Sequence, residues 1–198
     1  YVTGRMPLDD RGYTETVTVH QPAGLFATLF REALQRRGVR VNGRARALGW
    51  LERGFQSLDT SRLVELASVE SPPLRELVRE VQKPSQNLYT DLILAHIGER
   101  ERAQRAATNR AEGPISFRTS EELGVDALET FLERVGIGRN EVRFEEGSGL
   151  SRNNLATPNA IVKLLQFMDR HAEAEAWREA LPIAGVDGTL RNRMKDTP

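Results

Sequence analysis

Proline and glycine residues divide this chain into short segments, and their spacing limits the fold more than any other feature. Pro22 opens a segment whose apolar residues recur every three or four positions, and Gly38 closes it. Pro72 opens a second segment of the same kind, and Pro84 ends it. The sequence therefore predicts a protein built largely from separate amphipathic helices.

Four further helices are expected toward the C-terminus, three of them marked by capping residues. Ser85 is placed to cap the first of these helices, and Gly98 is placed to end it. Thr119-Ser120-Glu121-Glu122 has the form of a capping box and opens the second. Gly136 is expected to end the second helix, and Thr157-Pro158 to start the third. The fourth helix is expected over residues 172–181.

A few segments have the pattern of strands. Residues 13–20 alternate with β-branched side chains, and residues 62–70 and 142–144 are also expected to be extended. Residues 99–118 are charged and irregular, so we expect a mobile loop there. The chain should therefore be mainly helical with a few strands.

The composition excludes several classes of function. The 28 basic residues balance 28 acidic ones and are interleaved with them, which disfavours binding to nucleic acid. The chain has no cysteine, so disulfides and thiolate metal sites are excluded. No apolar run approaches the roughly 20 residues that a membrane span requires. A hydrophobic content of 39% fits a globular protein with a core.

Several candidate catalytic patterns do not hold. Glu145 and Glu146 are adjacent in an expected strand, so they should point to opposite faces and make a poor glycosidase pair. Gly147-Ser148-Gly149 is not the Gly-x-Ser-x-Gly motif of the hydrolases. None of the histidines has the spacing of a zinc-binding helix; they are His20, His96 and His171. We interpret these residues as structural.

Three segments carry a more specific pattern. The upstream segment reads Ser-Pro-Pro-Leu at residues 71–74, followed by Lys-Pro-Ser-Gln-Asn-Leu-Tyr at residues 83–89. Residues 146–158 read Glu-Gly-Ser-Gly-Leu-Ser-Arg-Asn-Asn-Leu-Ala-Thr-Pro, and residues 181–190 read Leu-Pro-Ile-Ala-Gly-Val-Asp-Gly-Thr-Leu. Together, and in this order, they closely resemble the type-4 low-molecular-mass penicillin-binding proteins. These are the D-alanyl-D-alanine carboxypeptidase/endopeptidases of peptidase family S13. The resemblance covers roughly residues 20–198.

The chain departs from the family at two of its three active-site motifs, which are Ser-x-x-Lys, Ser-x-Asn and Lys-Thr-Gly. No lysine has a serine three residues before it, and Lys195-Asp196-Thr197 is not Lys-Thr-Gly. The chain also begins with Tyr1 instead of methionine. We therefore expect a fragment that starts after the nucleophile and stops before the third motif, and that is inactive alone.

The resemblance assigns roles to the motif that is present. It implies that the hydroxyl of Ser85 passes a proton to the leaving D-alanine nitrogen, and that the amide of Asn87 grips the backbone of the acyl donor. It also implies that a loop of Ser148, Gly149 and Leu150 contacts the substrate. The structural alternatives are that Ser85 is only a helix cap, worth roughly 1 kcal/mol, and that the loop only needs positive φ. Lys83 is expected to be a solvated surface lysine.

The resemblance implies an α+β fold of the penicillin-binding (DD-peptidase/β-lactamase-like) type, of which this chain is a mainly helical portion. Residues 1–20 would end an inserted domain, and residues 21–198 would belong to the penicillin-binding domain. The parent protein would hydrolyse D-Ala-D-Ala ends or cross-links of peptidoglycan through an acyl-serine intermediate, with no cofactor and no metal. It would be periplasmic or extracytoplasmic, with peptidoglycan stem peptides as partners and β-lactams as inhibitors.

Two other readings stay open. The parent could be a catalytically silent relative that binds cell-wall peptides. Alternatively the likeness is only architectural and the chain is a helical interaction module. The second reading would gain support if Ser85 and Asn87 did not share a cleft with Ser148–Leu150.

Overall fold

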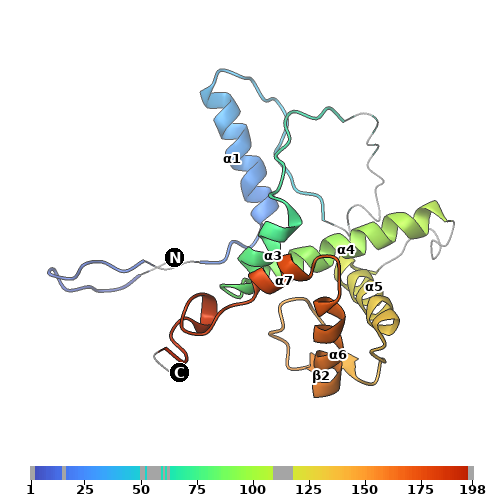
Figure 1. Cartoon of the computed structure of the whole chain (residues 1–198). Coiled ribbons are helices and arrows are strands. Elements are labelled where there is room, and N and C mark those ends of the chain that lie inside the picture. Colours follow the sequence, from blue (N-terminus) through green and yellow to red (C-terminus); the bar gives the residue numbers. More distant parts are fainter. Residues whose placement is uncertain are drawn as a thin grey trace. The chain divides into compact units, whose positions relative to one another are not determined.

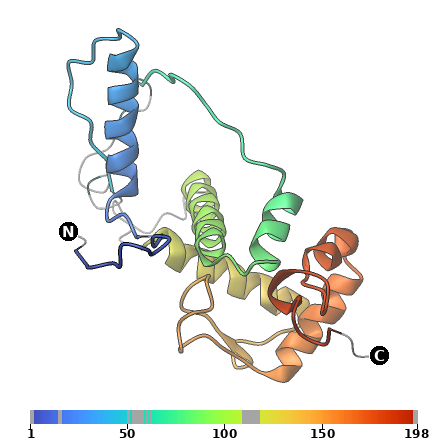
Figure 2. The same ribbon diagram turned by 90° about the vertical axis from the view of Figure 1, so that its left-hand side faces the viewer.

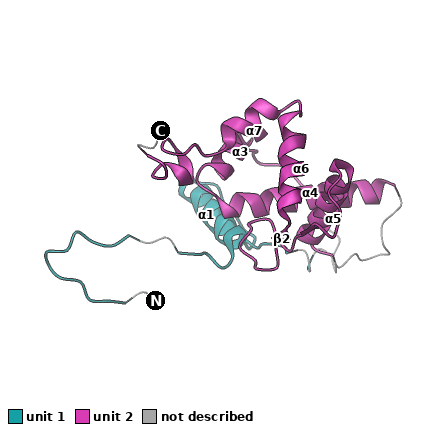
Figure 3. Ribbon diagram, turned by 60° about the horizontal axis from the view of Figure 1, so that its bottom comes forward, with its two compact units in different colours: residues 1–55 teal, residues 56–198 magenta. Residues whose placement is uncertain are grey.

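The computed structural model describes residues 3–14, 17–49, 52, 59, 61, 63–108 and 118–195. Contacts divide the chain into two compact units, residues 1–55 and residues 56–198 (Figure 3). Helix α1 belongs to the first unit, and the sheet and all further helices described below belong to the second. The domain limit expected at residue 20 stays a prediction.

The first unit contains α1 (Pro22–Arg36), which begins with proline as predicted. Gly38 follows the helix with a φ of 82°. Phe26 and Phe30 stack on one side with ring centroids 6.0 Å apart. The strand predicted over 13–20 is wrong for residues 13, 14 and 17–20, and the other two residues lie outside the described part. Val17 is 69% exposed there, and a strand without a neighbour to pair with is not stable.

The second unit is mainly helical (Figure 1). Its helices are α3 (Leu74–Gln82), α4 (Asn87–Ala107), α5 (Ser120–Val135), α6 (Pro158–Asp169) and α7 (Ala174–Ala180). A two-stranded antiparallel sheet joins β1 (Val142–Arg143) to β2 (Leu155–Ala156), and the short 3-10 helix η2 covers Gly188–Leu190. The strand predicted over 62–70 is wrong for residues 63–70, which are exposed coil, and residue 62 is not described.

Helices α4 and α5 make the most extensive contact of the second unit. They approach so closely that a Cβ on Gly98 would lie 1.7 Å from the carbonyl oxygen of Ser120, and one on Gly124 would lie 2.4 Å from that of Leu94. The prediction that Gly98 ends its helix is therefore wrong: α4 continues to Ala107, and the glycine serves helix packing. The loop expected over 99–118 is helical as far as residue 107, and residues 109–117 lie outside the described part.

The caps of α5 and α6 confirm the sequence predictions. The backbone amide of Glu122 donates to the hydroxyl of Thr119, and the amide of Thr119 donates to the Glu122 carboxylate. Gly136 ends α5 in the left-handed region, with a φ of 87°. Thr157 caps α6 by accepting from the amide of Ala160, with proline at the first helical position. The fourth predicted helix is present as the shorter α7.

A small apolar core lies between α5, α6 and the sheet. Leu132, Ile137 and Ala160 are buried there, and Phe131 meets Phe167 edge to face at 5.6 Å. Thr157 donates its backbone amide to the carbonyl of Glu141, next to the pairing of Val142 with Ala156. The strand predicted over 142–144 is thus confirmed for two of its residues. The sheet fixes both ends of the glycine-containing loop that follows β1.

Helix α3 lies beside α7 (Figures 1 and 2). The segment that follows α7 passes the end of α3, where the amide of Thr189 donates to the carbonyl of Lys83 at 3.0 Å. Among the described residues, no helix combines the length and apolar character needed to cross a membrane.

Candidate active site

The Ser-x-Asn triplet lies in the turn between α3 and α4. Ser85 has a φ of 61°, in the left-handed region that non-glycine residues seldom adopt. The amide of Gln86 reaches back across it to the carbonyl of Val81 at 2.9 Å. This is the Schellman pattern of a helix end, in which glycine usually holds the left-handed position. Placing a serine there costs about 1 kcal/mol.

This geometry corrects the role predicted for Ser85 in the helix. The N-cap of α4 is Gln86, not Ser85, and no side chain caps the helix. Ser85 therefore terminates α3 instead of opening α4. The structural alternative, in which Ser85 serves only to cap the helix that follows, is therefore wrong. Backbone strain without a capping hydrogen bond is often found at functional sites.

One cleft brings the Ser-x-Asn triplet and the glycine loop together. It has a volume of about 190 Å³, and its walls include Ser85, Asn87, Thr90 and Ser148. Ser85 is exposed and Asn87 is half-buried. The expectation that Ser85 and Asn87 share a cleft with the loop is met for Ser148. Gly149 and Leu150 do not line this cleft, and Leu150 is 73% exposed.

Two contacts attach the glycine loop to α4. The amide of Gly147 donates to the carboxylate of Asp91 at 3.1 Å. A Cβ on Gly147 would lie 2.8 Å from the carbonyl oxygen of Thr90, so only glycine allows this approach. Ser148, one residue further, is thereby placed opposite the first turn of α4.

Glu146 holds the loop in shape. Its carboxylate accepts hydrogen bonds from the hydroxyl and the amide of Ser148, from the amide of Ser151 and from the side-chain amide of Asn154. The donation from the Ser148 hydroxyl, followed by the bonds from the two backbone amides and Asn154, lowers the pKa of Glu146 to about 2 against the opposing effect of burial. Because the Ser148 hydroxyl already donates to Glu146, it has only acceptor capacity left for a substrate.

Glu145 supports the second half of the same loop. Its carboxylate accepts from the hydroxyl of Ser151 and from the side-chain amide of Asn153, and these bonds lower the pKa of Glu145. The sequence assigned Glu145 and Glu146 to opposite faces of a strand. They lie beyond β1 instead, and both carboxylates bind Ser151. The structural role expected for them is kept, but the strand geometry behind it was wrong.

Lys83 is not the solvated lysine that the sequence predicted. Its side chain is only 15% exposed. The ammonium group donates to the carbonyl of Leu181 at 2.9 Å and to the carboxylate of Asp187 at 2.5 Å. These contacts join two segments about a hundred residues apart, so no local sequence pattern could indicate them.

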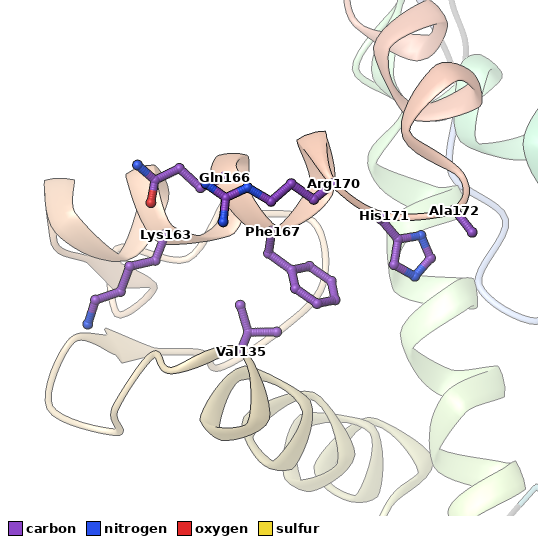
Figure 4. A pocket seen from close by; sticks show the side chains of 7 residues that line it. All are labelled: Val135, Lys163, Gln166, Phe167, Arg170, His171 and Ala172. Carbon is purple, nitrogen blue, oxygen red and sulfur yellow. The ribbon is translucent and has the colours of Figure 1, made fainter.

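A larger pocket of about 490 Å³ lies along α6, away from the Ser-x-Asn triplet (Figure 4). Phe167 points from α6 toward Val135 of α5, and Arg170 and His171 follow at the end of α6. None of the site residues predicted from the sequence lines it. Within the described ranges, no three histidine, aspartate or glutamate side chains are grouped as a metal site requires.

Comparison with known proteins gives consistent matches. A D-alanyl-D-alanine carboxypeptidase of Actinomadura sp. (strain R39) is 33% identical over 201 residues, which cover 99% of this chain and 34% of that protein. D-alanyl-D-alanine carboxypeptidase DacB of Haemophilus influenzae is 32% identical over 128 residues, covering 65% of this chain and 24% of the relative. This chain therefore spans about a third of the length of the first relative, and less of the second.

The solved structures agree. Penicillin binding protein 4 (dacB) from Haemophilus influenzae, complexed with a β-lactam, matches with a TM-score of 0.57 and 25% identity over 89% of this chain and 36% of that one. The α+β penicillin-binding fold predicted from the sequence is thereby confirmed. A family model described as the D-Ala-D-Ala carboxypeptidase 3 (S13) family matches residues 1–198. The resemblance found in the three segments is confirmed, and the chain belongs to the D-Ala-D-Ala carboxypeptidase 3 (S13) family.

Proposed function

We propose that this chain is part of a serine-type D-Ala-D-Ala carboxypeptidase/endopeptidase that hydrolyses peptidoglycan peptides through an acyl-serine intermediate. The observation that carries the proposal is the cleft in which Ser85, Asn87 and Ser148 meet. The family match and the carboxypeptidase relatives support it. Peptidoglycan as substrate implies a periplasmic or extracytoplasmic location, and the β-lactam bound to the Haemophilus protein supports β-lactams as inhibitors.

In this proposal the chain supplies supporting groups and not the nucleophile, since its sequence holds no Ser-x-x-Lys. The attacked peptide bond releases D-alanine, whose nitrogen must gain a proton. The exposed hydroxyl of Ser85 is the group that delivers this proton. The amide of Asn87 offers both a donor and an acceptor to the peptide backbone of the acyl donor. Ser148 faces them across the cleft and accepts from the substrate, and Gly149 and Leu150 contact it further out.

We also propose the domain division expected from the sequence, in which residues 1–20 end an inserted domain and residues 21–198 belong to the penicillin-binding domain. The break in contacts after Phe55 divides the chain at a different point. Limited proteolysis of the full-length gene product, with mass mapping of the fragments, distinguishes the two limits.

The test of the function is covalent labelling of the full-length gene product with a penicillin, followed by intact mass and adduct mapping. We expect one adduct on a serine outside this chain, and loss of the adduct when that serine becomes alanine. Ser85→Ala should lower the acylation rate at least about tenfold, in line with the usual contribution of a positioned proton donor.

Ser61→Ala is the matched control, because the Ser61 hydroxyl is also exposed and donates to the carboxylate of Asp59, two residues earlier in the chain. It should leave the acylation rate unchanged. A folded protein that forms no adduct would favour a cell-wall peptide-binding module without catalysis. An adduct that forms equally fast in Ser85→Ala would remove Ser85 from the mechanism.

A further inference from the structure

Lys83 connects the Ser-x-Asn turn to the segment that follows α7. Its ammonium group lies between the carboxylate of Asp187, at 2.5 Å, and the carbonyl of Leu181, at 2.9 Å. Its own carbonyl accepts from the amide of Thr189 at 3.0 Å. The residue is therefore held through both its side chain and its backbone by one partner segment.

That partner segment is itself fixed. The second carboxylate oxygen of Asp187 accepts from the amide of Ile183 at 2.8 Å and closes the turn between them. Gly188 follows with a φ of 58°, and a Cβ there would lie 2.5 Å from the carbonyl oxygen of Lys83. The close approach requires glycine, so the segment is shaped to receive the end of α3.

Ser85 lies two residues after Lys83 in a disfavoured backbone conformation. Such a conformation persists only where the surroundings over-determine it. On one side it is held by the bond from the amide of Gln86 to the carbonyl of Val81. On the other side the contacts of Lys83 stop the last turn of α3 from unwinding. Removing them should let Ser85 relax toward an ordinary conformation, which would move its side chain within the cleft.

We propose that Lys83 is a positioning residue: by bonding to Asp187 and Leu181 it holds Ser85 in its left-handed conformation and so aims the Ser85 hydroxyl into the cleft. We call the contacts of Lys83 with Leu181, Asp187 and Thr189 the Lys83 lock. The catalytic consequence rests on the proposed function, whereas the conformational consequence does not. The lock gives residues 181–190 a part in the site although none of them lines the cleft.

The test uses the full-length gene product with Lys83→Met, which keeps the apolar stem and removes the charge. Asp187→Asn is the milder second variant, since its amide oxygen can still accept from Ile183. Lys163→Met is the matched control: the Lys163 ammonium also binds one carboxylate, of Glu141 at 2.7 Å, and one carbonyl, of Gly136 at 2.9 Å, but it lies away from the cleft.

Two readouts are measured. The first is penicillin acylation, separated into initial binding and the acylation rate constant. Lys83→Met should lower the rate constant roughly 10- to 100-fold with initial binding little changed, since a small misplacement of a catalytic group has that effect. The second is amide hydrogen exchange, which should become faster in peptides containing Gln86 and Thr189. Asp187→Asn should shift both readouts in the same direction, and Lys163→Met should shift neither.

The outcomes distinguish the conformational role of the Lys83 lock from its effect on acylation. Unchanged exchange at Gln86 and Thr189 in both variants overturns the lock. Faster exchange with an unchanged acylation rate constant overturns the positioning role. Equal losses of acylation in Lys83→Met and Lys163→Met also overturn it, because they would reflect general destabilisation. If the wild-type protein forms no adduct, the proposed function fails, while faster exchange in Lys83→Met alone still supports the lock.

Discussion

The carboxylate of Glu146 holds the glycine loop through several hydrogen bonds, so its neutralisation should weaken the loop. Glu146→Gln keeps the shape of the side chain and removes the charge. The wild-type carboxylate accepts four hydrogen bonds, from Ser148, Ser151 and Asn154. A glutamine has one acceptor oxygen, and its amino group would face some of these donors without an acceptor between them.

The size of the expected loss in unfolding free energy follows from the pKa of Glu146. Folding lowers the pKa of Glu146 from its ordinary value of 4.5 to about 2. A group shifted this far stabilises the folded state by at most about 3 kcal/mol at neutral pH. Water reaches the half-buried side chain, and screening reduces the expected loss in Glu146→Gln to roughly 1–2 kcal/mol.

The sign of the pH dependence is fixed by the direction of this change. Because the folded-state pKa lies below the unfolded one, the stabilisation is complete above about pH 4.5 and is lost as the pH falls toward 2. The difference between wild type and Glu146→Gln should therefore be largest at neutral pH and shrink in acid.

The assay is urea unfolding of the chain at a series of pH values from 7 to about 3, followed by tryptophan fluorescence, to which Trp177 in α7 contributes. Glu175→Gln, on the exposed side of the same helix, is the control and should change the unfolding free energy little at any pH. A difference between wild type and Glu146→Gln that stayed constant across this range would refute the assignment of the stabilisation to the Glu146 charge.

Two further substitutions test the packing and the strain. Gly98→Ala would place a Cβ 1.7 Å from the Ser120 carbonyl oxygen, so it should lower the unfolding free energy by about 3 kcal/mol in urea titrations. Gly43→Ala, with open space around it, is the control and should have little effect. Equal effects of the two substitutions would contradict the packing role of Gly98. Ser85→Gly should raise the unfolding free energy by up to about 1 kcal/mol, because it removes the cost of a positive φ. It should still slow penicillin acylation, because the hydroxyl is lost. A loss of stability would instead show that the serine side chain stabilises the turn.

Local signals were sufficient for the helix ends that depend on neighbouring residues. The capping box at Thr119, the left-handed Gly136 and the cap at Thr157 all lie within a few residues of the groups they bind, so their patterns could be read directly. Gly98 could not be read in this way. A glycine is required at this position because the backbone of Ser120, on another helix, lies too close for a Cβ. From the chain alone, a glycine inside a helix looks like a stop signal.

Within the candidate site, residue types were predictable and conformations were not. The resemblance indicated Ser85, Asn87 and Ser148, and the structure brings these three to one cleft. It did not indicate that Ser85 holds a left-handed conformation, because that depends on how α3 ends. The burial of Lys83 was missed for the related reason that its partner, Asp187, is about a hundred residues away.

The three segments that carry the family resemblance are the three that converge on the turn between α3 and α4. Residues 83–89 form this turn and the start of α4, Gly147 binds the first turns of α4 through Asp91, and residues 187–189 hold Lys83. Two of the contacts need a glycine, since a Cβ on Gly147 or Gly188 would meet a backbone carbonyl within 3 Å. A motif residue can therefore be required without touching a substrate. Residues 181–190 are best understood in this way, as the support that keeps a strained serine in place, and the hydrogen exchange of Lys83→Met measures that support directly.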